Sequence, residues 1–559
     1  DGGALSGGWG LGQGREKATA SLYLSRRTHL HFEPMEGSLT APQAQTLLAR
    51  LRPEFAIALG SAAPTKFFEG VWAVNAYQSE NFTPTKSRIW NAPNEAQNAD
   101  MASGYRIHPW ELETVVNEFF IHKHQSLYRS FNPGDWNHWA FIISHLRRIE
   151  NAESAVFSLP ENIIDHLFHI GSRQFEWQSG FLNYSELFRG IYVYGQGECA
   201  NRFEKKYGID INSFFAYGFA LLSMFLRAPS CRADIDLDII GLNREEDDIA
   251  SSILTDDFSE LCRLAEVERL RASEIAYKPS ILRLKPCIRA GFRNRHIFCP
   301  LPELIMKRVS TGIFYDIVDG GHIVREDYGR RFEKYVALLA STYQPQMNLR
   351  TEETYKTRHG EFKTPDIFLG TDSTVDIVVE CKASRMNYET RFSDIDDLPS
   401  HGYDEMTKAV FQIWRHAYHS RLGKAAPRLH DQTIGLVLTL DDWFQGGVRR
   451  QEMVLKNARS LLEEKYPDSS PLDQIPVAFS SMTEFEAILQ TGTPSSIVET
   501  LREAASEEKR GWSITSLHRD ATRSQKHFQK FAFHSELERM LPFWADVRKR
   551  AEERERLRN

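Results

Sequence analysis

Three charged side chains near residue 370 carry the strongest chemical signal in this sequence. Asp366 stands in the segment T-P-D-I-F-L-G, and Glu380 and Lys382 follow in V-D-I-V-V-E-C-K-A. Because side chains alternate faces along a strand, Glu380 and Lys382 are expected on one face and the apolar residues between them on the other. With Asp366 they can surround one divalent cation, and oxygen ligands suit Mg²⁺ or Mn²⁺. Such an ion stabilises charge on a scissile phosphate and lowers the pKa of a bound water, which Lys382 would orient.

These residues resemble a known motif. Pro365-Asp366, followed after a short turn by Glu380-Cys381-Lys382, resembles the PD-(D/E)xK nuclease superfamily with its restriction-endonuclease-like fold. The resemblance covers about residues 326–490. It implies that Asp366 and Glu380 bind the metal ion, that the backbone carbonyl of Cys381 is a further ligand, and that Lys382 assists the attacking water. It also implies phosphodiester hydrolysis, with DNA expected as the substrate by analogy with most relatives and RNA left open.

Two further residues fit the surroundings of that motif. Members of the superfamily often carry a Glu on the helix before the first core strand, and some carry a Gln on the helix after E-x-K. Glu333 lies beside the apolar stripe of R-R-F-E-K-Y-V-A-L-L, and Gln412 lies on the polar side of the later helix. Both are candidate catalytic residues. As alternatives, Glu333 fits an ordinary solvated helix position, Gln412 a polar-face position, and Glu380 with Lys382 an exposed ion pair.

Two groups of basic side chains are candidates for binding nucleic acid, because phosphate contacts need clustered positive charge. One group shares the polar face of the helix after E-x-K, and the other is expected on one helical face of the tail, near several phenylalanines. The first comprises Lys408, Arg415, His416 and His419, and the second Arg519, Arg523, Lys526 and Lys530. Either group also fits a solvated helix face.

Hydrophobic spacing predicts the elements that position these residues. Helices are expected over 328–340, over 404–420 and from about 450, and strands over 346–355, 364–369, 375–383, 433–440 and 475–480. Interleaved strands and helices predict an α/β restriction-endonuclease-like nuclease domain over 326–490, preceded by a large, mainly α-helical N-terminal region. The remaining ranges are expected to be a flexible leader or expression remnant (1–15), a small mixed region (16–105), a mainly helical domain (106–325) and a helical tail (491–559).

Composition sets limits on function. The 559 residues are 42% hydrophobic and 26% charged, an ordinary globular composition, and their net charge of −7 excludes a polycation that coats nucleic acid. The six cysteines are scattered without a C-x-x-C pair, which favours reduced thiols and a cytoplasmic protein over a zinc ribbon or disulfide framework. The longest charge-free stretch, 211–226, is shorter than the ~20 apolar residues of a membrane span and is expected to be a buried helix.

The sequence therefore predicts a divalent-metal-dependent endonuclease. A nuclease fused to a large helical module resembles restriction or anti-phage defence effectors of bacteria. The helical region is expected to recognise a target, restrain the nuclease, or contact a partner protein or another copy of the chain. Two alternatives stay open: a non-catalytic module that binds nucleic acid or protein, and a nuclease subunit that is active only within a complex.

Overall fold

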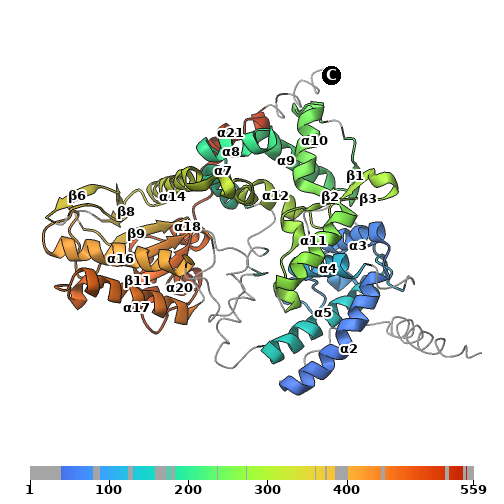
Figure 1. The fold of residues 1–559 in the computed structure, drawn as a ribbon, viewed down its shortest axis with the longest axis horizontal. Helices are drawn as coiled ribbons and strands as arrows, with labels where there is room; N and C mark the ends of the chain where they lie inside the picture. Colours follow the sequence, from blue (N-terminus) through green and yellow to red (C-terminus); the bar gives the residue numbers. More distant parts are fainter. Residues whose placement is uncertain are drawn as a thin grey trace, which may run out of the picture.

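The chain folds into a helical part and a sheet-containing part that meet along the long helix α14 (Gly321–Tyr343) (Figure 1). The structure is a computed structural model. It describes residues 39–79, 88–123, 130–157, 173–174, 177, 183–235, 237–271, 274–358, 360–371, 374–383, 401–441, 447–522, 528–545 and 549. The N-terminal helices lie at one end of the view and the C-terminal sheet at the other. This arrangement confirms a helical N-terminal region followed by an α/β domain.

The N-terminal core is built from helices, three of which begin with a proline in the first turn. Its helices are α2 (Ala41–Gly60), α3 (Pro64–Tyr77), α4 (Pro109–His122), α5 (Trp136–Phe157) and α11 (Phe258–Glu268). Proline fits the first turn of a helix, where its missing N–H is not needed. Within the described part of 16–105, the regular elements are helical and share one core with α4 and α5. Two of the helices in this part of the expected small mixed region have a proline in the first turn.

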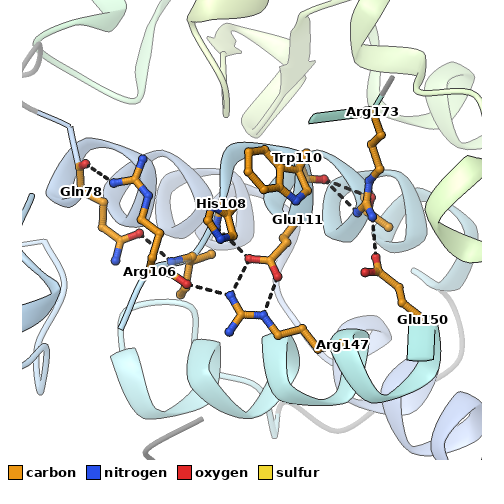
Figure 2. A network of polar contacts seen from close by, with 10 residues as sticks. Gln78, Arg106, His108, Trp110, Glu111, Arg147, Glu150 and Arg173 are labelled. Carbon is orange, nitrogen blue, oxygen red and sulfur yellow. Dashed lines mark hydrogen bonds and ion pairs between the residues drawn. The ribbon is translucent and has the colours of Figure 1, made fainter. Parts of the chain in front are cut away.

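A polar network fastens α4 to its neighbours (Figure 2). Glu111 of α4 accepts a hydrogen bond from Nη2 of Arg147 in α5 at 2.9 Å, and the same guanidinium group donates to the backbone oxygen of Arg106 at 2.7 Å. Arg106 in turn donates to the backbone oxygen of Gln78 at 2.7 Å. Because buried charges are costly unless they are paired, these contacts fix one arrangement of the helices. The network therefore has a structural role.

A small sheet and several helices connect the two ends of the molecule. The strands β1 (Ser230–Arg232), β2 (Thr255–Asp257), β3 (Cys287–Ala290) and β4 (His296–Phe298) are ordered β1-β4-β3-β2. The helices are α7 (Tyr184–Tyr194), α8 (Gly197–Tyr207), α9 (Ile211–Phe225), α10 (Arg244–Leu254), α12 (Glu303–Val309) and α13 (Phe314–Ile317). Helix α9 is largely buried, as predicted. Across the described ranges no single helix meets the length and hydropathy of a membrane span, although α8 and α9, bent by 72°, do so as a pair.

The C-terminal part contains a five-stranded sheet ordered β11-β10-β9-β8-β5. Its strands are β5 (Asn348–Thr351), β8 (Ile367–Gly370), β9 (Ile377–Lys382), β10 (Ile434–Thr439) and β11 (Val477–Ser481). Strands β9, β10 and β11 are parallel, and β8 is antiparallel to β9 and β5. Helices α16 (His401–Arg421) and α17 (Val448–Lys465) cover one face, and α14, α18 (Met482–Thr491) and α19 (Pro494–Ala505) cover the other. A separate hairpin is formed by β6 (Thr354–Thr357) and β7 (Gly360–Lys363).

The two faces of this sheet belong to different cores. Ile377, Val379 and Cys381 of β9 join the core shared with α14, whereas Val378 packs with α16, which confirms the predicted alternation. The core on the α14 side continues through α7 and α9. The boundary expected at 325/326 therefore falls inside α14, whose side chains pack against both parts of the chain.

The described part of the tail does not form one continuous basic helix. Helix α20 (Ile514–Ala521) ends before the expected stripe is complete, and α21 (His534–Met540) begins after it. Arg519 and Lys530 are exposed but do not share a helix, and Arg523 and Lys526 lie outside the described residues. The nearby Phe533 is buried and stacks on Phe188 of α7 at 4.9 Å between ring centroids.

Candidate metal-binding and catalytic site

The pairing of β8 with β9 brings the two halves of the motif together. Ile367 lies opposite Val379, so Asp366, one residue earlier, comes opposite Glu380. The Oδ2 atom of Asp366 accepts a hydrogen bond from the backbone N–H of Cys381 at 2.6 Å. Thirteen residues separate Asp366 from Glu380 along the chain, and the antiparallel register brings the two residues side by side.

Lys382 joins this strand to the helix behind it. Its Nζ atom lies 2.9 Å from Oε1 of Glu380 and donates to Oε1 of Gln412 in α16 at 3.3 Å. The Glu380 side chain is almost fully buried, and that of Lys382 is only 14% exposed. This burial distinguishes the pair from a solvated ion pair, and Gln412 lies within hydrogen-bond distance of Lys382.

The electrostatic environment of these groups is dominated by clustered carboxylates. Burial, together with the charges of Glu380 and Glu333, raises the pKa of Asp366 to about 9. Burial, with Glu352 and Glu380 nearby, also raises the pKa of Glu333, which places this helix α14 residue within electrostatic reach of the strand. Burial raises the pKa of Glu380 despite the ammonium group of Lys382. Burial alone would lower the pKa of Lys382, but the adjacent Glu380 carboxylate reverses this and raises it.

The donor set fits a hard divalent cation. Oε2 of Glu380 is buried and has no hydrogen-bond partner within the described ranges, and an unsatisfied buried oxygen of this kind is costly. The side-chain carboxylates of Asp366 and Glu380 and the backbone oxygen of Cys381 are all oxygen donors, which suit Mg²⁺ or Mn²⁺. In the described part of the chain, no three His, Cys, Asp or Glu side chains are already gathered at metal-ligand spacing.

The structure adds one carboxylate that sequence patterns did not single out. Glu352 follows β5, contributes to the raised pKa values of Glu333 and Glu380, and lies 2.8 Å from Nζ of Lys363. The motif gave no signal for Glu352, because its link to the site depends on the pairing of β5 with β8. Glu352 shares one feature with Asp366 and Lys382, which is that each of the three residues lies at an end of a strand.

The basic stripe predicted on α16 is corrected by the structure. His416 and His419 are 0% and 1% exposed, so neither side chain is available on the surface. The β6–β7 hairpin covers this side of α16, and Tyr355 shares a 2.8 Å hydrogen bond with Nδ1 of His419. Arg415 is half-buried and donates to the backbone oxygen of Lys363 at 2.9 Å.

Lys408 of α16 remains exposed beside Glu405. The surface left for a phosphate backbone on this helix is therefore Lys408 and part of Arg415, without the two histidines.

Comparisons of the chain with protein-family models, with curated proteins and with solved structures found no match. The chemistry of the site is therefore argued from its own side chains.

Proposed function

We propose that the protein is a divalent-metal-dependent endonuclease that hydrolyses phosphodiester bonds, with DNA as the favoured substrate. One observation carries the proposal: Asp366, directly before β8, lies beside buried Glu380 of the paired strand β9, and Lys382 lies between Glu380 and Gln412. The proposed finer fold is restriction-endonuclease-like, supported by a Glu-bearing helix before the strands, a strand under each half of the motif and a Gln-bearing helix after it.

The residues of the site have distinct proposed roles. Asp366, Glu380 and the Cys381 carbonyl oxygen would hold the ion, which supplies positive charge for the scissile phosphate and lowers the pKa of a bound water. Lys382, held by Glu380 and Gln412, keeps an ammonium group at the site to orient the attacking water or offset developing negative charge. Glu333 adds a third carboxylate from α14, and Gln412 restrains the position of Lys382.

The substrate would approach from the side of α16. Lys408 is exposed there, and the guanidinium group of Arg415 packs over the ring of Phe362 at 5.3 Å. Cationic side chains beside a cation site match the charge of a phosphate backbone.

The test is cleavage of plasmid and linear DNA with Mg²⁺ or Mn²⁺, comparing the wild type with Asp366→Ala and Lys382→Ala. Both variants are expected to lose at least about a hundredfold in rate, since loss of one charge-stabilising group in an active site typically has an effect of this size. Glu464→Ala and Lys456→Ala, which change exposed side chains of α17, are matched charge controls expected to keep wild-type activity. EDTA is expected to abolish cleavage.

The alternatives give different results. Cleavage that survives both site substitutions would contradict the assignment of these residues. Mn²⁺ binding that depends on Asp366, measured by calorimetry without any cleavage, would instead favour a non-catalytic module or a subunit that requires a partner.

A further inference from the structure

A second surface, which is positively charged, lies at the other end of the molecule from the sheet that carries β9 (Figure 1). It is the loop that joins β3 to β4, and we define residues 291–296 as the hairpin tip. All six residues, G-F-R-N-R-H, are exposed. The ring of Phe292 is 76% exposed, more than that of any other aromatic residue that the structure describes.

The backbone of the hairpin tip is strained at an arginine. Arg293 and Asn294 have φ angles of 54° and 53°, both in the left-handed region. Asn tolerates this conformation. Arginine is disfavoured there because its Cβ crowds the backbone. A disfavoured residue held at a turn points to a role for its side chain beyond the turn itself.

The side chains of the hairpin tip form a positively charged group with an aromatic ring. The guanidinium group of Arg293 lies 5.2 Å from the centre of the Phe292 ring. Neither Arg293 nor Arg295 has an ion pair with any residue that the structure describes. In the pairing of β1 with β4, Arg232 lies directly opposite His296, although Asp234 neutralises Arg232 at 2.6 Å. The net positive charge therefore comes from Arg293 and Arg295, in a chain whose total charge is −7.

We propose that the hairpin tip binds single-stranded nucleic acid. Arg293 and Arg295 contact phosphates, and Phe292 stacks on an unpaired base. Exposed aromatic rings beside unneutralised arginines are the combination that such strands bind, because every base offers a face for stacking and every nucleotide a phosphate. A duplex hides the faces of its bases, so the exposed ring favours an unpaired strand. The hairpin tip would give the proposed nuclease a binding surface remote from the proposed metal site. This inference rests on the proposed nuclease function only for the class of ligand, which is nucleic acid.

The test measures binding of a fluorescein-labelled oligothymidylate and of a matched duplex to the full chain by anisotropy, in EDTA so that no cleavage occurs. Arg293→Asn with Arg295→Asn is expected to weaken binding of the single strand at least about tenfold. The slope of the logarithm of the binding constant against the logarithm of the salt concentration should also become shallower by about 1.4, since each single-strand phosphate contact contributes about 0.7 to this slope. Phe292→Ala is expected to weaken binding about fivefold or more without changing the salt dependence.

Two controls separate binding from folding and from charge. Arg293→Asn places a residue that tolerates the left-handed region into the turn, so the melting temperature is expected to stay the same or rise while affinity falls. Lys205→Gln with Lys456→Gln removes the same two charges from exposed positions on α8 and α17 and is expected to leave binding unchanged.

The proposal is overturned if the wild type does not bind the oligonucleotide, or if the double arginine variant binds as the wild type does. A preference for the duplex that is unaffected by Phe292→Ala overturns the assignment to single strands. Because binding is measured without metal, a wild type that binds through the hairpin tip but never cleaves would contradict the proposed nuclease while supporting this surface.

Discussion

At the scale of single residues, burial decides which ionisable groups act as charges. His416 illustrates this on the helix that also supplies Gln412. Its Nε2 atom lies 3.3 Å from the backbone oxygen of Pro427, and its Nδ1 atom is buried without a hydrogen-bond partner in the described ranges. Burial lowers the pKa of His416 to about 4. This histidine is therefore neutral near pH 7 and contributes packing rather than charge.

This lowered pKa predicts acid sensitivity. Unfolded chains take up a proton at His416 below about pH 6.5, whereas the folded protein resists until about pH 4. As far as His416 is concerned, the free energy of unfolding is therefore highest above about pH 6.5 and decreases as the pH falls toward 4. From pH 7 to pH 5 the loss amounts to about 2 kcal/mol in the free energy of unfolding.

Urea unfolding followed by circular dichroism at both pH values measures this effect. His416→Gln is expected to lose less stability than the wild type on acidification, even if it is less stable at pH 7. His322→Gln changes an exposed histidine of α14 and serves as the control. An equal pH response in the wild type and the His416 variant would contradict the burial argument.

At the scale of elements, patterns with a clear period were predictable and short elements were not. The alternation in β9 follows from its sequence, and the apolar stripe of α16, including Met406 and Trp414, is buried as predicted. The strands β1 to β4 have three or four residues each, too few for a period of two to stand out.

The second face of α16 shows another limit of sequence reasoning. Period alone assigns His416 and His419 to a polar face. What covers that face is the β6–β7 hairpin, whose Tyr355 bonds to His419. A contact between segments more than sixty residues apart leaves no mark in the local pattern. The residues of the proposed metal site were accessible to sequence reasoning because their chemistry and strand spacing are both local.

Two ion pairs in the helical part, one buried and one near the surface, give a prediction at this scale. Arg308 of α12 binds Asp316 of α13 through two hydrogen bonds, at 2.6 and 2.7 Å, and both side chains are 4% exposed. Arg202 of α8 binds Asp319 through a similar pair of bonds near the surface. Removing one partner of a buried pair leaves an uncompensated charge, which typically costs about 3–5 kcal/mol, whereas an exposed pair contributes little.

Arg308→Met is therefore expected to destabilise the protein by about 3–5 kcal/mol, and Arg202→Met by far less. Replacing both Arg308 and Asp316 with apolar residues should recover much of the loss, because no charge is then left buried. Chemical unfolding of the three variants measures these differences. Equal effects of the two single substitutions would mean that burial does not set the strength of these pairs.

At the scale of the whole molecule, the proposed nuclease domain does not have a separate hydrophobic core. Val324 and Tyr335 of α14, Val379 of β9 and Phe188 of α7 all belong to one continuous core. The segment 528–545 closes it from outside: Gln529 donates to the backbone oxygen of Tyr343 at 2.8 Å, and the downstream aromatic rings pack on α7 and α9.

This shared core predicts where the chain can be divided. A fragment of residues 326–490 lacks α7, α9 and the C-terminal segment, so it would expose the α14 side of its core to water. Each large apolar side chain left exposed removes about 1.5–3 kcal/mol of stabilisation, and several such losses exceed the stability of a typical domain. The fragment is therefore expected to lack a cooperative thermal transition and to aggregate, whereas the full-length chain retains the core and should unfold cooperatively. Circular dichroism of the fragment and of the full-length chain decides between a shared core and a self-sufficient domain, since cooperative unfolding of 326–490 alone would show that the helical part is dispensable for folding.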